Sequence, residues 1–147
     1  MAETMPPGWD VKILATDLDT DVLLQGERGI YDESRVEGLD KAVVKRWFVK
    51  SAKQPGKVRV KPELQELIHF RKLNLLQPWP MKGPIDIIFC RNVIIYFDMP
   101  TKQKLMNRYA DMLISSGHLF LGHSEAMNNM STRFSLCGKS VYMKRES

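Results

Sequence analysis

The pattern of apolar and polar residues is most pronounced between Ile85 and Phe97, where an almost unbroken apolar stretch is interrupted by the adjacent pair Arg91 and Asn92. An apolar run of this kind predicts a strand that is buried on both faces of a parallel sheet. Polar residues just beyond the carboxyl end of such a strand lie where open α/β sheets bind their ligands. Arg91 and Asn92 are therefore candidate site residues, although they could equally open an ordinary loop.

Further strands are predicted by short apolar runs or by strict alternation. Apolar runs lie at 11–16, 68–73 and 118–122, and two short strands are expected around Gly138 and Lys139 near the end of the chain. Between Lys57 and Lys61, basic residues alternate with valines, which predicts a strand with one solvated face. Together with residues 47–49 and the turn at Pro55 and Gly56, this strand suggests a small antiparallel excursion from the main sheet.

Helices are predicted between these strands. Asp19 or Thr20 can cap a helix that runs to about Gly26, with Gly29 as its stop, and a short helix is expected at 41–46. A longer helix begins at Asp98 and Pro100, and we expect it to end at Ser116 and Gly117. Its apolar residues fall at helical spacing: Leu105, Met106, Tyr109, Met112 and Leu113.

Strands that alternate with helices are typical of a doubly wound α/β sheet. The chain has 147 residues, of which 44% are hydrophobic, so it is long enough for one ordinary domain with one core. The formal net charge is +5, but the basic residues are dispersed among carboxylates, so no nucleic-acid partner is expected. The two cysteines and three histidines show no metal-ligand spacing, and no segment predicts a leader or a membrane span. We therefore expect a soluble, cytoplasmic protein.

The expected carboxyl ends of the parallel strands carry most of the candidate chemistry. Polar residues follow four strands: Asp17 with Asp19, Asn74, Arg91 with Asn92, and the segment 123–125. In a doubly wound sheet these ends share one edge, so the side chains are expected to converge on one crevice. An acidic residue such as Asp17 suits the paired hydroxyls of a ribose, but it could equally cap the following helix.

Several of these segments, in the same order along the chain, resemble the CheR family of chemotaxis receptor methyltransferases. The similar segments are Ala15–Leu23, Gly29–Tyr31, Asn74–Leu76, Asp86–Asp98 and Gly122–Glu125. The block Phe-Cys-Arg-Asn-Val-Ile-Ile-Tyr-Phe-Asp is the most specific of them. The resemblance runs from about Val11 to Lys144.

The resemblance implies a function and a fold. Such enzymes use S-adenosyl-L-methionine to methylate glutamate side chains on the cytoplasmic helices of methyl-accepting chemoreceptors. Their Rossmann-like sheet carries a small antiparallel β-subdomain, which would correspond to residues 47–61 within a methyltransferase domain at 1–147. The implied cofactor-binding residues are Asp17 at the ribose, Asn74 and Leu75 at the adenine, and Arg91 and Asn92 at the methionyl part. Arg91 and Tyr96 would also serve catalysis.

One feature of the family has no match in the sequence. CheR enzymes carry a helical amino-terminal domain and then a first strand that wraps the cofactor, whereas Pro6 and Pro7 here lead directly into what resembles the second strand. We therefore expect the chain to be a partial methyltransferase domain. The alternative is a non-catalytic CheR-like module that binds a receptor peptide by strand addition. A nicotinamide-dependent oxidoreductase is ranked last because no Gly-x-Gly-x-x-Gly segment is present.

Overall fold

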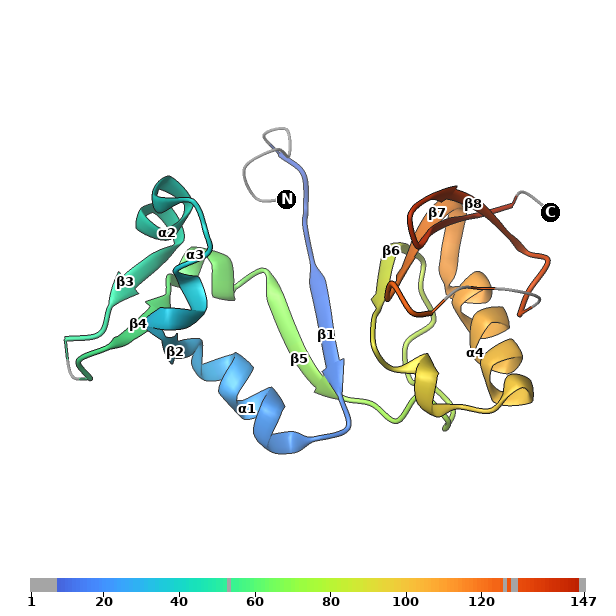
Figure 1. Ribbon diagram of the computed structural model, residues 1–147, viewed down its shortest axis with the longest axis horizontal. Coiled ribbons are helices and arrows are strands. Elements are labelled where there is room, and N and C mark those ends of the chain that lie inside the picture. The colour runs from blue at the N-terminus through green and yellow to red at the C-terminus, as the bar shows by residue number, and fades with distance from the viewer. Residues whose placement is uncertain (1–7, 53, 126, 128–129, 146–147) are drawn as a thin grey trace. The chain divides into compact units, whose positions relative to one another are not determined.

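A computed structural model describes residues 8–52, 54–125, 127 and 130–145, and it shows a mixed α/β protein (Figure 1). Its contacts divide the chain into two compact units, Met1–Asn74 and Leu75–Ser147. The described strands form three sheets, of which two lie in the first unit and one in the second. Each unit is therefore described by itself.

The first unit contains a parallel pair of strands. β1 (Ile13–Asp17) pairs with β5 (Ile68–Lys72) so that Asp17 lies opposite Lys72. Helix α1 (Thr20–Arg28) packs on β5, and the Phe70 ring lies so close to Gly26 that a side chain there would collide with it. The close approach explains why this helix position carries a glycine, whose usual cost in a helix is about 1 kcal/mol.

The ends of α1 follow the sequence prediction. The Asp19 side chain accepts a hydrogen bond from the Asp21 N–H and so caps the helix. Gly29 closes it in the left-handed conformation, with a φ of 62°. Both choices reflect ordinary helix-end chemistry, in which a short acidic side chain satisfies an amide and glycine adopts positive φ without strain.

An antiparallel sheet lies in the chain between β1 and β5. Its central strand is β4 (Lys57–Val60), with β2 (Ile30–Asp32) on one side and β3 (Phe48–Lys50) on the other. The sequence predicted β3 and β4 but missed β2. The connecting turns of helix are η1 (Glu33–Val36), α2 (Lys41–Trp47) and α3 (Pro62–Gln65).

The second unit contains a four-stranded mixed sheet in the order β6, β7, β9, β8. β6 (Ile85–Cys90) and β7 (Leu113–Leu121) are parallel, so that Cys90 lies opposite Leu121. β9 (Val141–Lys144) and β8 (Phe134–Gly138) add antiparallel strands beyond β7. The short helix η2 (Ile94–Tyr96) and the long helix α4 (Met99–Met112) connect β6 to β7.

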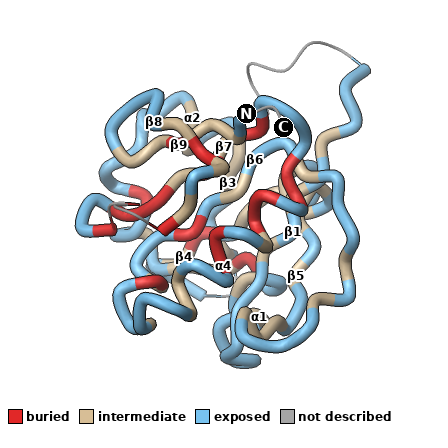
Figure 2. Tube along the Cα trace, turned by 90° about the vertical axis from the view of Figure 1, so that its right-hand side faces the viewer, coloured by how far each residue is buried: buried red, intermediate tan, exposed pale blue. Residues whose placement is uncertain are grey.

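The hydrophobic core belongs mainly to the second unit. Met106 and Ala110 of α4 and Leu119 of β7 are completely buried, and Ile94 of η2 is 1% exposed. Figure 2 colours the buried positions along the chain red. In the described residues of the first unit, the buried hydrophobic side chains are Val36 and Val58. The loops of the second unit are therefore supported by a packed hydrophobic core. None of the helices in the described part of the chain combines the length and the apolar character needed to cross a bilayer.

Two sequence predictions differ from the structure. Helix α4 ends at Met112, and Ser116 and Gly117 lie inside β7 and not at the end of the helix. Leu113 is already in an extended conformation, so the strand begins directly after the helix. Ser116 interrupts the regular strand backbone with a left-handed φ of 61°. β6 is also not buried on both faces, since Phe89 is 63% exposed at the edge strand of its sheet.

Candidate functional site

The parallel strands of the first unit bring Asp17 and the segment before Asn74 together. The Leu73 N–H, just after β5, donates to the carbonyl oxygen of Asp17 at 2.9 Å. Asp17 therefore ends β1 directly beside the point where β5 ends, and Asn74 follows one residue later. Both positions lie at the carboxyl edge of the same parallel pair, as the strand pattern predicted.

The alternative role of Asp17 as a helix cap is not what the structure shows, because Asp19 caps α1. Asp17 instead accepts a hydrogen bond from the Asp19 N–H at 2.9 Å through Oδ1. The residue is exposed, and among the described residues no donor binds its Oδ2 atom. The Asp17 carboxylate is thus oriented by the Asp19 N–H through Oδ1, and Oδ2 can accept a hydrogen bond from a ribose hydroxyl.

Leu75 is held in the second unit by two side chains. Its carbonyl oxygen accepts hydrogen bonds from Nη1 of Arg108 at 2.9 Å and from Nε1 of Trp79 at 3.2 Å. The Arg108 guanidinium also lies 5.5 Å from the centroid of the Trp79 ring. Trp79 in turn packs at 5.5 Å against the ring of Tyr109 in the core. Leu75 is therefore held in place by Arg108 of α4 and by Trp79 in the segment that follows it.

Arg91 and Asn92 lie immediately after β6, and both are exposed. Asn92 adopts a left-handed conformation with a φ of 59°, which asparagine tolerates better than most residues. Tyr96 closes the short helix η2 and is 80% exposed, while its neighbour Ile94 anchors the same helix in the core. The loop after β6 thus exposes the side chains of Arg91, Asn92 and Tyr96, while Ile94 anchors its backbone in the core.

Glu125 is a site residue whose role sequence reasoning missed. It is 2% exposed, and its carboxylate accepts hydrogen bonds from four backbone N–H groups. Oε2 is 2.7 Å from the N atom of Gly122 and 2.8 Å from that of Asn92. Oε1 is 2.8 Å from the N atom of Val93 and 3.3 Å from that of Ile95. A glutamate after an apolar strand gave no signal that it would turn inward.

The electrostatics of this cluster favour an ionised Glu125. Burial by itself would raise the pKa of Glu125, but hydrogen bonds from the N–H groups of Gly122, Asn92, Val93 and Ile95 hold it below its ordinary value. Burial raises the pKa of the Cys90 thiol and of the hydroxyl of Tyr109, which are hydrogen-bonded to each other. Cys90 is therefore a neutral core residue at pH 7 and not a nucleophile.

The predicted site residues thus fall into two sets. Asp17 and Asn74 lie at the strand ends of the first unit. Leu75, Arg91, Asn92 and Tyr96 lie in the second unit, where Leu75, Val93 and Phe97 pack against the same core. His123 and Ser124 follow β7 and are exposed. The convergence of the two sets on one crevice stays a prediction.

Comparison with known proteins places the chain in a family. The family described as "CheR methyltransferase, SAM binding domain" matches residues 1–143. A probable chemotaxis protein methyltransferase of Rhizobium etli is 46% identical over 121 residues, which are 82% of this chain and 45% of the relative. The chemotaxis protein methyltransferase of Escherichia coli K12 is 40% identical over 141 residues, which are 95% of this chain and 49% of the relative. Chemotaxis protein methyltransferase 2 of Pseudomonas aeruginosa is 42% identical over 134 residues, covering 90% of this chain and 48% of the relative.

The chain therefore belongs to the CheR methyltransferase family and matches its SAM-binding domain. It spans about half the length of the curated relatives that it matches. The cofactor of this family is S-adenosylmethionine. Within the first unit, the exposed Asp17 carboxylate has the acceptor chemistry that ribose hydroxyls require. Within the second unit, the exposed side chains of Arg91 and Asn92 have the hydrogen-bonding chemistry that a charged amino-acid group requires.

Proposed function

We propose that the chain is part of an enzyme that methylates glutamate side chains on chemoreceptors. The observation that carries this proposal is the loop after β6, where exposed Arg91 and Asn92 stand on a backbone held by a buried carboxylate. A rigid loop with exposed polar side chains at the end of a parallel strand suits ligand binding. The names of the relatives support methyl transfer in chemotaxis.

The residues that would hold the cofactor are those at the strand ends. Asp17 would accept hydrogen bonds from the ribose, Asn74 and Leu75 would line the adenine, and Arg91 and Asn92 would contact the methionyl part. When bound, S-adenosylmethionine supplies an electrophilic methyl group on a sulfonium centre. This set of roles rests on the family resemblance together with the exposure of Asp17, Arg91 and Asn92.

Methyl transfer to a carboxylate requires the protein to position the substrate, and it does not require proton transfer. The reference pKa of a glutamate side chain lies well below 7, so the accepting carboxylate is already ionised at pH 7 and needs no general base. The protein must instead align its oxygen with the methyl carbon and limit access of water. Arg91 would orient the substrate carboxylate, and the exposed ring of Tyr96 would form a wall that is covered when substrate binds.

The finer architecture is part of the same proposal. We expect β1, β5, β6 and β7 to belong to one Rossmann-like sheet, since each belongs to a parallel pair with site residues after its carboxyl end. The antiparallel strands β2, β4 and β3 would form the inserted β-subdomain that includes residues 47–61. The cytoplasmic helices of chemoreceptors would be the substrate, which implies a cytoplasmic site of action.

Radioactive methyl transfer tests this function. The chain is incubated with methyl-labelled S-adenosylmethionine and membranes that contain a chemoreceptor, and the labelled receptor is then treated with alkali. Glutamyl methyl esters hydrolyse in alkali, so the proposal predicts label that is released as methanol. Label that resists alkali, or that stays on a receptor whose methylated glutamates are replaced by alanine, would contradict it.

A second candidate function is favoured by the antiparallel sheet. β2 and β3 are its edge strands, and a cavity of about 450 Å³ lies beside β3, lined by residues that include Val44, Phe48 and Val58. The lining also includes charged residues such as Glu33 and Lys50. An edge strand next to a cavity with both apolar and charged walls is suited to a peptide that adds as a further strand. A chain that binds the receptor but neither binds S-adenosylhomocysteine nor transfers methyl groups would favour this non-catalytic role.

A further inference from the structure

We propose that Glu125 is a positioning residue whose buried carboxylate holds the loop after β6 in the conformation that presents Arg91 and Asn92 to the cofactor. The inference rests on the proposed function, because it gives a role to a residue that supports the same site. Glu125 itself is 2% exposed and lies beneath the loop, so it is not placed in contact with substrate.

The carboxylate joins the ends of two neighbouring strands. Cys90 and Leu121 are paired at the ends of parallel β6 and β7, and the chain leaves both strands at the next residue. Oε2 of Glu125 binds the N–H of Gly122 at 2.7 Å on one side and the N–H of Asn92 at 2.8 Å on the other. One oxygen atom therefore fixes the distance between the two loops.

The second oxygen orients the rest of the loop. Oε1 binds the N–H groups of Val93 at 2.8 Å and Ile95 at 3.3 Å, so three amides between Asn92 and Ile95 point at one carboxylate. Several N–H groups that converge in this way need an acceptor that can take more than one hydrogen bond. A buried N–H group without a hydrogen-bond partner costs free energy of folding. A charged carboxylate is also among the strongest acceptors for backbone N–H groups. Removing the negative charge of Glu125 should weaken these hydrogen bonds and let the backbone between Asn92 and Ile95 change conformation.

Gly122 provides the space that this arrangement requires. A Cβ atom built at Gly122 would lie 2.5 Å from Oε2 of Glu125 and 3.0 Å from Oδ1 of Asn92. Any side chain at this position would therefore push the carboxylate away from the loop. Gly122→Ala gives an independent way to disturb the arrangement while the charge of Glu125 is kept.

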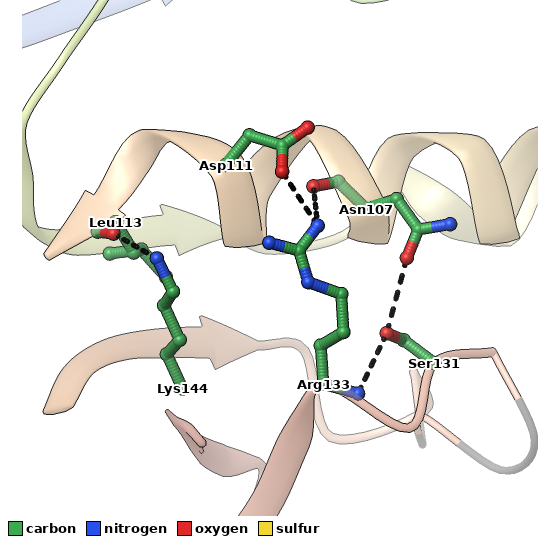
Figure 3. Close-up of polar contacts among 6 residues, drawn as sticks. All are labelled: Asn107, Asp111, Leu113, Ser131, Arg133 and Lys144. Atoms are coloured by element: carbon green, nitrogen blue, oxygen red, sulfur yellow. Dashed lines mark hydrogen bonds and ion pairs between the residues drawn. The ribbon is translucent and has the colours of Figure 1, made fainter. Parts of the chain in front are cut away.

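Described residues that follow Glu125 in the sequence make contacts with β9 and α4. The Met127 N–H donates to the hydroxyl of Tyr142 at 3.0 Å. Further along, Nη1 of Arg133 lies 2.6 Å from Oδ1 of Asp111 and 3.2 Å from the carbonyl of Asn107 on α4 (Figure 3). Ser131 adds a contact to the side chain of Asn107. Met127 is thus held by β9, and Ser131 and Arg133 are held by α4.

The test compares the wild-type chain with Glu125→Gln and Gly122→Ala. Glu66→Gln is the matched control, because it makes the same chemical change at an exposed carboxylate. Two quantities are measured: the dissociation constant for S-adenosylhomocysteine by calorimetry, and the backbone amide chemical shifts of the ligand-free chain by NMR. Glu125→Gln and Gly122→Ala are expected to weaken binding at least tenfold and to shift the amides of Asn92, Val93 and Ile95. Glu66→Gln should change neither.

The pH dependence of the backbone amide chemical shifts can be measured on the wild-type chain. This experiment tests the proposal even if Glu125→Gln does not fold. The amides of Gly122, Asn92, Val93 and Ile95 should shift together as the pH falls through the lowered pKa of Glu125. Burial raises the pKa of the Cys90 thiol and of the Tyr109 hydroxyl, and the negative charge of Glu125 raises both further, so both groups stay neutral in this range.

Two results would contradict the proposal. The first is wild-type affinity in Glu125→Gln, and the second is the absence of a common titration of the four amides. A wild-type chain that does not bind S-adenosylhomocysteine at all would contradict the proposed function, and with it the cofactor step of this inference. Retained binding in Glu125→Gln would contradict only the role of Glu125. The two failures are therefore distinguishable.

Discussion

The guanidinium of Arg108 donates to the carbonyl oxygen of Leu75 at 2.9 Å and, through the same Nη1 atom, to that of Gln77 at 2.9 Å. Arg108 lies on α4, 33 positions away from Leu75 in the sequence. A residue of the long helix therefore fixes the backbone of a segment that we expect to line the adenine. The same principle applies to Glu125, which fixes the loop that carries Arg91 from a distance of more than thirty residues.

We predict that Arg108→Ala lowers both stability and cofactor affinity. The loss of hydrogen bonds from a charged, half-buried donor should reduce the free energy of unfolding by about 1–3 kcal/mol. The freed Leu75 segment should also weaken binding of S-adenosylhomocysteine. Urea denaturation and calorimetry measure the two effects. Lys104→Ala on the exposed side of α4 is the control, and equal stability of the two variants would show that the contacts to Leu75 and Gln77 contribute little.

The stability of the chain should depend on the ionisation of Glu125. Its pKa in the folded chain lies below the ordinary value of 4.5, because the backbone hydrogen bonds outweigh the effect of burial. Ionised Glu125 therefore stabilises the fold at pH values above about 4.5, and this contribution is lost as the pH falls through the lower pKa of the folded state. Other carboxylates also titrate in this range, so the comparison must be made with Glu125→Gln.

Denaturation curves between pH 7 and pH 3 measure this dependence. The free energy of unfolding of the wild type should exceed that of Glu125→Gln by about 1.5–3 kcal/mol at pH 7, the usual range for hydrogen bonds to a charged group. The difference should shrink toward pH 3. A difference between the two proteins that is independent of pH would mean that the charge of Glu125 does not stabilise the fold.

Arg91→Ala should lower the methylation rate more than the stability. The residue is exposed after β6, so few packing contacts are lost, and the melting temperature should change little. Removal of a positioning or electrostatic group at a reacting centre should reduce the rate of glutamate methylation by about ten- to a thousandfold. Both quantities should be measured on one preparation. A strongly destabilised variant with normal specific activity would contradict the catalytic role of Arg91.

The elements that sequence reasoning predicted well are those determined by local chemistry. Gly29 ends α1 because it adopts positive φ, and the Asp98 side chain accepts the Thr101 N–H at the start of α4. The alternation of valines and basic residues in β4 likewise reflects a strand with one buried face. These signals need no knowledge of the rest of the fold, so the sequence alone contains them.

The features that were missed depend on distant parts of the chain. β2 is a three-residue strand whose pairing with β4 is decided by residues 25 or more positions away, and α4 passes into β7 without a glycine stop. Glu125 is the clearest case in the site, because an acidic residue after a strand is usually exposed. Its inward orientation depends on amides of a loop about thirty residues earlier, and no local pattern records that relationship.

An extended chain should bind the cofactor more tightly. The relatives are about twice as long as the matched region. The resemblance to the CheR family implies, as a proposal, that a strand outside this region wraps the cofactor. Joining the preceding segment of the Escherichia coli relative to this chain should strengthen binding of S-adenosylhomocysteine at least tenfold, or by about 1.4 kcal/mol. Equal affinities of the two versions would show that the pocket is built without that segment.

Calorimetric titration with S-adenosylhomocysteine, carried out on the wild-type chain and on Asp17→Ala, tests whether the chain binds the cofactor with Asp17 at the ribose. We predict saturable binding of one ligand per chain, weakened about tenfold by Asp17→Ala, because the exposed carboxylate would no longer accept hydrogen bonds from the ribose. Asp10→Ala removes an exposed carboxylate before β1 and should leave the affinity unchanged. If a folded wild-type chain gave no heat of binding at millimolar ligand, the chain would not bind the cofactor as proposed. An Asp17→Ala variant that bound as tightly as the wild type would show that Asp17 does not hold the ribose.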